Sequence, residues 1–200
     1  MEDGVSKLQF AKVMIAALAY LARKQSDTFG LYTVNEHNIS VVQPRFEQQQ
    51  FMRFLNELVK VKSEGTWKKG NGLELLYDHH GKEMILFFTD LYDEQEDLFR
   101  FISRLKTPRN EVIVFHILGK HERDFDFEGS FTFEDLESNV RVKADTTIQR
   151  KEYTERVGGW IKQSRAWMLE KHINYQLVVM NDPIEQTLRD FLKIRKIINR

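Results

Sequence analysis

The amino-acid sequence predicts an α/β domain with a mostly parallel sheet and helices on both faces. Strand-like segments alternate along the chain with segments whose apolar residues recur every three or four positions, as on one face of a helix. Residues 83–89 and 112–118 are nearly continuous apolar runs, which are typical of strands buried on both faces of a parallel sheet. Strands and helices that alternate in this way indicate a doubly wound arrangement.

The amino-terminal part is expected to begin with a helix that Ser6 caps. The apolar residues of this helix have helical spacing: Leu8, Ala11, Ile15, Leu18 and Ala22. Two short strands, 29–34 and 38–42, are expected to pair as a hairpin that Pro44 closes. A second helix is predicted over 47–62 because it too has an apolar face.

The carboxyl-terminal part contains the two apolar strands and a third strand. A glycine-rich loop, 63–72, and a short helix, 73–79, precede the first of them. A helix over 94–106 separates the two apolar strands. The inward face of that helix is expected to consist of Leu98, Phe101, Ile102 and Leu105. Strand 174–179 and a closing helix over 184–194 complete the predicted domain.

The segment between the last two strands has a different character. Residues 121–143 alternate phenylalanine with acidic residues, which favours short antiparallel strands or turns. A long helix over 147–171 follows, and Gly158 and Gly159 lie in its middle. Each glycine costs about 1 kcal/mol relative to alanine, which indicates a kink or a close contact there. We therefore expect one domain over residues 1–200, with a small irregular or antiparallel insert at about 121–143.

Composition excludes several functional classes. The chain has 30 basic and 30 acidic residues, so its formal net charge of zero gives no general attraction to nucleic acid. The absence of cysteine excludes disulfides and thiolate metal sites. The apolar stretch 13–22 is about half as long as a membrane span requires. Residues 1–12 also lack the features of a signal peptide, and we expect a soluble, cytoplasmic protein with no membrane span.

Polar residues follow the strongest predicted strand, at the end where α/β sheets bind their ligands. Four residues occupy this position: Thr89, Asp90, Tyr92 and Asp93. Hydroxyl and carboxylate oxygens are the ligands that Mg²⁺ prefers, so one interpretation is a cation site. Alternatively, Asp90 and Asp93 cap a helix that begins near Glu94. Spacing alone favours this second interpretation.

The histidines and glycines of the chain are better explained as structural features. His79 and His80 are adjacent and do not share a helix face, so we expect exposed loop histidines and no zinc site. His116 lies within a strand and is expected to be a core or sheet residue. Gly65 and Gly70 have the separation found in a phosphate loop, but the residues after them do not match that motif.

Short segments along essentially the whole chain resemble the landmarks of a known family. They are Ser6-Lys7-Leu8, 16–21, Gln25-Ser26-Asp27, Pro44-Arg45, Thr89-Asp90-Leu91, 111–118, 131–137 and 188–195. In their order and spacing they are similar to the domain-of-unknown-function-58 family. The resemblance implies a von Willebrand factor A-like fold, with a doubly wound, mostly parallel sheet and helices on both faces.

This fold carries a metal-ion-dependent adhesion site, in which a bound cation recruits a carboxylate from a partner protein. In this chain, the resemblance assigns Asp90 to the position of the site's aspartate. The middle ligand position falls at Asn71, with Thr66 as the alternative. The neighbouring residues that the resemblance places against a partner are Thr89, Tyr92 and Asp93.

The family's usual first strand and its Asp-x-Ser-x-Ser loop have no counterpart in this sequence. The resemblance therefore implies an N-terminally truncated chain with a degenerate metal site. Mg²⁺ or Mn²⁺ is expected to bind it weakly or not at all. Without that central strand, its two neighbours would have unpaired backbone groups, so the chain should be marginally stable, swap strands, or depend on a partner.

The resemblance also implies a function, because members of the family are often encoded beside MoxR-type AAA+ ATPases. We expect a non-catalytic protein-interaction domain that acts with such an ATPase in chaperone-like assembly or regulation. A hypothesis from another class is a metal-dependent hydrolase that uses Asp90 and Asp93, with His116 as a further candidate. A third is a structural remnant that binds no ligand.

Overall fold

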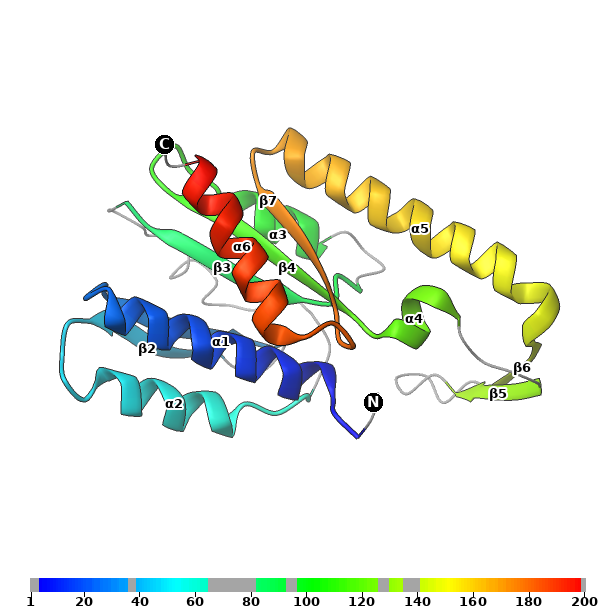
Figure 1. Ribbon diagram of the computed structural model, residues 1–200, viewed down its shortest axis with the longest axis horizontal. Coiled ribbons are helices and arrows are strands. Elements are labelled where there is room, and N and C mark those ends of the chain that lie inside the picture. Colours follow the sequence, from blue (N-terminus) through cyan, green and yellow to red (C-terminus); the bar gives the residue numbers. More distant parts are fainter. Residues whose placement is uncertain are drawn as a thin grey trace.

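Within the described residues, three parallel strands form the central sheet. They are β3 (Met84–Thr89), β4 (Glu111–Leu118) and β7 (Asn174–Val179), paired in the order β3-β4-β7. The computed structural model describes residues 4–35, 39–64, 82–92, 97–125, 130–134 and 141–198. Helices flank this sheet on both faces (Figure 1), so the described chain has the mixed α/β architecture that the sequence predicts.

One face of the sheet is covered by α1 (Lys7–Lys24) and α6 (Ile184–Ile198). Ser6 caps α1 as predicted: its Oγ accepts the Gln9 N–H at 3.1 Å, and Gln9 Oε1 accepts the Ser6 N–H at 2.8 Å. The buried side chains on this face come from both helices and from the sheet: Phe10, Ala11, Met14, Ile113, Phe115, Ile117, Val178 and Phe191.

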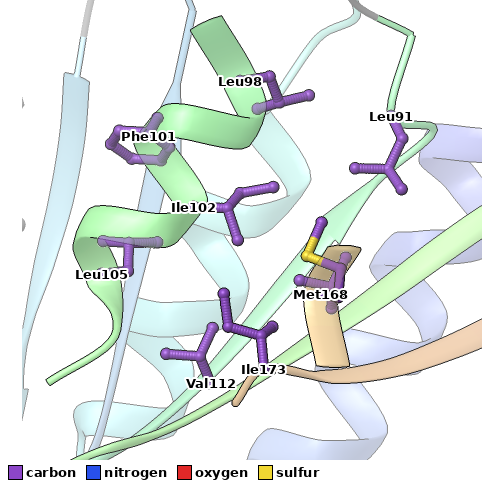
Figure 2. Close-up of a cluster of buried hydrophobic side chains, with 9 residues drawn as sticks. Leu91, Leu98, Phe101, Ile102, Leu105, Val112, Met168 and Ile173 are labelled. Carbon is purple, nitrogen blue, oxygen red and sulfur yellow. The ribbon is translucent and has the colours of Figure 1, made fainter. Parts of the chain in front are cut away.

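The opposite face is covered by α3 (Asp97–Leu105) and α5 (Thr146–Glu170). All four residues predicted for the inward face of α3 are buried here. The whole cluster consists of Leu91, Leu98, Phe101, Ile102, Leu105, Val112, Val114, Met168 and Ile173. Figure 2 shows Leu98, Ile102 and Leu105 on the side of α3 that faces Met168 and Ile173. The helical spacing of apolar residues therefore predicted this packing correctly.

A separate antiparallel hairpin lies beside this body, formed by β1 (Phe29–Val34) and β2 (Ile39–Arg45). It packs against α1 and α2 (Gln50–Lys60) through a third buried cluster: Ala19, Leu31, Phe54 and Leu58. The buried Gln50 amide donates to the carbonyl oxygens of Phe29 and Gln43, both at 2.9 Å. These hydrogen bonds fix the start of α2 to the hairpin.

The remaining described elements lie between β4 and β7 in the sequence. They are α4 (Lys120–Asp124) and the antiparallel pair β5 (Ser130–Glu134) and β6 (Arg141–Asp145). Figure 1 shows this pair at the amino end of α5, away from the central sheet. None of the helices in the described ranges is both long and apolar enough to cross a lipid bilayer.

The hairpin departs from the prediction at Pro44, which does not end its second strand. β2 continues through Pro44 to Arg45. The pairing with β1 shifts register between Phe29 and Leu31, so this part of the ladder is irregular. Proline is tolerated at such a bulge because a regular inter-strand N–H bond is not required there.

β3 is less buried than its apolar sequence predicts. Met84 is 41% exposed and residues 85–88 are only half-buried, whereas every residue of β4 after Glu111 is buried. A strand is buried on both faces only when neighbours cover it along both edges, and within the described residues β3 pairs with β4 alone. The three paired strands also lack the reversal of strand order that defines a doubly wound sheet, so that arrangement stays a prediction.

The glycine pair of α5 makes no close contact with the described residues, although a close contact was one of the two features predicted there. The helix is continuous from Thr146 to Glu170. A Cβ atom added at Gly158 or Gly159 would meet no atom within 4 Å. Neither glycine is therefore required by packing against the described residues.

Packing does require glycine at position 30. An added Cβ would lie 2.5 Å from the Val42 carbonyl oxygen and 2.9 Å from the Pro44 ring. We expect Gly30→Ala to lower the free energy of unfolding by about 1–3 kcal/mol, because backbone must move to admit the methyl group. Urea denaturation measures this change. Gly158→Ala is the matched control and should raise stability by up to about 1 kcal/mol; equal effects of the two variants would contradict this account.

Candidate functional site

The polar residues predicted after β3 lie at the carboxyl end of the parallel sheet. Thr89, the last residue of β3, is paired in register with His116 of β4. Asp90 follows directly, and Glu122 lies in α4, just after β4 ends. Lys7 is the first residue of α1. Figure 1 shows the amino end of α1, the ends of these strands and α4 on the same side of the molecule.

Lys7 joins the two carboxylates of this site. Its Nζ lies 3.2 Å from Asp90 Oδ2 and 2.9 Å from Glu122 Oε1. Burial acts to lower the pKa of Lys7, but the attraction of the two carboxylates outweighs it and the pKa is raised. All three side chains are partly exposed, so solvent screens the pairs and their contribution to stability is small. We call Lys7, Asp90 and Glu122 the Lys7 bridge.

The turn after β3 is held by Thr89 and Asp90, the hydroxyl and carboxylate that the cation interpretation places at the end of this strand. Thr89 Oγ1 accepts the Leu91 N–H at 2.9 Å, and Asp90 Oδ1 accepts the Tyr92 N–H at 3.4 Å. Both side chains therefore cap the turn itself. Leu91 has φ 57° and is 1% exposed, so its burial keeps a conformation that costs about 1–3 kcal/mol.

Glu122 is held in place from two directions. Its Oε2 accepts the Gly119 N–H at 2.9 Å, while Oε1 contacts Lys7. The Tyr153 hydroxyl of α5 donates to the main-chain oxygen of Glu122 at 3.0 Å. The Tyr153 ring lies against Phe125, with the ring centroids 4.6 Å apart. The Gly119 N–H and Lys7 thus hold the carboxylate of Glu122, while Tyr153 holds its backbone.

His116 is a core histidine, as the sequence predicts. It is fully buried, its Nδ1 lies 2.5 Å from the Tyr175 hydroxyl, and its ring packs edge-on against Trp160. Its Nε2 has no hydrogen-bond partner within the described residues. Burial lowers the pKa of His116 to about 4, although the nearby Asp90 carboxylate opposes that change. The imidazole is therefore neutral at pH 7.

The sequence was also compared with models of known protein families. A family model described as "Protein of unknown function DUF58" matches residues 3–159. The chain belongs to the DUF58 family. No curated protein matches it.

Among solved structures, this DUF58 chain is similar to the conserved hypothetical protein BatB from Bacteroides thetaiotaomicron, with a TM-score of 0.53 and 13% sequence identity. The match covers 96% of this chain and 89% of BatB. At this identity the likeness shows a shared fold alone.

Only part of the predicted metal site falls within the described residues. Asp90 stands at the expected sheet edge, and the Tyr92 side chain beside it is 63% exposed. The other residues proposed for this site lie outside the described residues: Thr66, Asn71 and Asp93. The hydrolase hypothesis needs Asp93 and therefore stays a prediction.

Within the described residues, Asp90 and Glu122 already contact a positive charge, the ammonium group of Lys7. Within the described ranges, no group of three or more histidine, aspartate or glutamate side chains is placed to hold a metal ion. The ammonium group of Lys7 instead lies where a cation would meet Asp90 and Glu122. A metal ion at these carboxylates would have to displace Lys7, at a cost in electrostatic energy.

Replacing Lys7 with methionine tests this interpretation. The variant leaves two carboxylates without their shared cation, so we expect its affinity for Mn²⁺ to exceed that of the wild type by roughly tenfold or more. Isothermal titration calorimetry with Mn²⁺ measures the difference. Lys24→Met, at the other end of α1, is the matched control and should leave Mn²⁺ binding unchanged. Equal Mn²⁺ affinities of Lys7→Met and wild type would show that Lys7 does not compete with a cation.

Proposed function

We propose that this DUF58 chain is a non-catalytic protein-interaction domain with a von Willebrand factor A-like fold. Its contact surface is the sheet edge around Asp90, and its partner is an AAA+ ATPase of the MoxR type. The observation that carries the proposal is the Lys7 bridge, in which a lysine takes the place of a cation beside Asp90. The partner class rests on the family resemblance.

The turn after β3 has the properties of a preorganised contact. Thr89 and Asp90 fix its backbone through side-chain hydrogen bonds, so little conformational freedom would be lost on binding. The Tyr92 ring next to it is exposed, and exposed tyrosine is one of the residue types enriched at protein interfaces. A fixed carboxylate beside an exposed aromatic ring suits recognition of a protein surface.

The charge of the Lys7 bridge indicates what the partner presents. One ammonium and two carboxylates give the three side chains a net charge of −1. Asp90 Oδ1 accepts the Tyr92 N–H at 3.4 Å, and a carboxylate oxygen can accept more than one donor. We therefore infer that a lysine or arginine of the partner contacts Asp90, and that this contact needs no bridging metal ion.

Binding to a MoxR-type ATPase from the same genome tests the proposal. Asp90→Asn removes the charge while keeping the shape, and Tyr92→Ala removes the exposed ring. Each is expected to weaken binding by about 1–3 kcal/mol, or roughly 5- to 150-fold, measured by biolayer interferometry. Phe46→Ala is the control, because Phe46 is 74% exposed and lies outside the Asp90 turn. Wild-type affinity in both Asp90→Asn and Tyr92→Ala would place the contact elsewhere.

A further inference from the structure

Three helices form one layer over the central sheet and the hairpin, with α1 in the middle. α1 and α6 share the buried cluster that contains Phe10 and Phe191. α1 and α2 share the cluster that contains Ala19 and Phe54. Figure 1 shows α6, α1 and α2 one after another on the same side of the molecule. We call these three elements the helix layer, and its outer side is the one turned away from both sheets.

The outer side of α1 is apolar, although no described residue covers it. Residues 13–22 are all apolar, and a run of this length makes every face of a helix apolar. Val13 and Tyr20 lie two helical turns apart on the same face and are 55% and 45% exposed. A helix that is apolar all round is normally buried on every side. The outer side of α1 therefore has the composition of a contact surface.

The other exposed apolar side chains of the helix layer have basic neighbours, as α1 does. Lys24 Nζ lies 5.5 Å from the centre of the Tyr20 ring. Elsewhere on the layer, an exposed apolar residue is adjacent in the sequence to a lysine or arginine. These pairs are Val13 with Lys12, Met52 with Arg53, Val59 with Lys60, and Leu192 with Lys193.

Exposed apolar residues on other elements have acidic neighbours instead. Those outside the helix layer include Met84 of β3, Tyr92 after β3 and Leu169 of α5. Their sequence neighbours are Glu83, Asp93 and Glu170, in that order. The combination of exposed apolar and basic side chains is therefore a property of the helix layer and not of the chain in general.

The net charge of the helix layer differs from that of the rest of the chain. α1, α2 and α6 contain ten basic and three acidic residues. The whole chain has 30 of each, so the rest of it has 20 basic and 27 acidic residues. Lys7 and Arg53 pair with carboxylates outside the three helices, which still leaves eight basic residues against three acidic ones. A layer with this excess of positive charge attracts an anionic partner.

We propose that the outer side of the helix layer binds the surface of an anionic lipid membrane. Its basic side chains would contact lipid phosphates, while the apolar side chains between them enter the boundary with the acyl chains. Lysine suits this position because its stem lies along apolar surface while its charge stays in water, as Lys24 does over Tyr20. This surface does not include the Asp90 turn, and the inference does not depend on the proposed function.

The distribution of the side chains favours a lipid surface over a folded protein. The exposed apolar residues are spread over three helices, with basic residues between them. Protein interfaces instead concentrate their binding energy in a compact, fully desolvated cluster at the centre. Lipid headgroups adapt to separated side chains, and each basic residue near an anionic surface adds to the attraction.

Co-sedimentation of the full 200-residue chain with lipid vesicles tests the inference. One set of vesicles has equal parts of phosphatidylglycerol and phosphatidylcholine, and the other has phosphatidylcholine alone. The double variant Val13→Gln with Val59→Gln removes two exposed apolar side chains from the layer and changes no charge. Leu169→Gln is the matched control, because Leu169 is 57% exposed on α5. Circular dichroism checks that each variant is folded.

We expect the chain to bind the anionic vesicles, and to bind roughly tenfold or more weakly in the double variant, on neutral vesicles and at high salt. Leu169→Gln should bind as the wild type does. Absence of binding to the anionic vesicles would overturn the inference, as would an equal loss in Leu169→Gln and the double variant. Equally tight binding to soluble polyglutamate would assign the layer to an acidic polypeptide instead. Self-association of the chain that the double variant abolishes would assign it to a second copy.

Discussion

Replacing Phe115 with alanine is expected to lower the free energy of unfolding by about 3–5 kcal/mol. Phe115 is 0% exposed at the centre of the cluster between the sheet, α1 and α6. Its ring is stacked on Phe88, with centroids 4.7 Å apart and planes at 8°, and lies edge-on to Phe191 at 5.2 Å. Truncation removes contacts to a second strand and a helix together, and a close-packed core relaxes only partly around the cavity.

Urea denaturation followed by circular dichroism measures the effect of Phe115→Ala. Phe46→Ala serves as the control, since Phe46 is 74% exposed and its loss should change stability by no more than about 0.5 kcal/mol. A loss below about 1 kcal/mol in Phe115→Ala would mean that this side chain does not occupy the centre of the core.

The second large expected effect is a pH dependence of the free energy of unfolding, and it is expected to come from His116. In the unfolded chain this histidine binds a proton below about pH 6.5, whereas burial lowers its pKa in the folded chain to about 4. The unfolded state therefore holds more protons between these values, and stability falls as the pH is lowered from about 6.5 towards 4. The contribution is fully present above pH 6.5, and its loss amounts to about 2 kcal/mol at pH 5.

The double variant His116→Leu with Tyr175→Phe isolates this contribution, because it removes the titrating ring and its hydroxyl partner together. Free energies of unfolding at pH 7.5 and pH 5.0 should differ less in the variant than in the wild type, by about 2 kcal/mol. His172→Asn is the control at an exposed histidine and should keep the wild-type difference. The same pH dependence in double variant and wild type would show that His116 is not held neutral by burial.

The parts of the fold that depend on one helix or strand alone were predictable from the sequence. Leu98, Phe101, Ile102 and Leu105 share one face of α3 because of helical periodicity, and all four are buried. The burial of β3 was not predictable, because it depends on whether another strand pairs with its second edge. Gly30 likewise owes its role to Pro44, which reaches it only once the hairpin forms.

The candidate site shows the same division. Asp90 follows an apolar strand directly, so the rule that ligands sit at strand carboxyl ends selected it. Lys7 lies 83 positions away in the sequence, and no local pattern pairs it with Asp90. Glu122 stands in a segment that the sequence identified only as an irregular insert. The net charge of the site therefore depends on three segments that are distant in the sequence, and no local pattern predicts it.

Hydrogen exchange of this DUF58 chain, with and without a MoxR-type ATPase, tests whether the Asp90 turn is part of the protein-interaction surface. We expect amides around the Asp90 turn, at residues 89–92, and around α4, at residues 119–125, to exchange more slowly in the complex. Unchanged exchange at both the Asp90 turn and α4 would contradict the claim that this sheet edge is the protein-interaction surface.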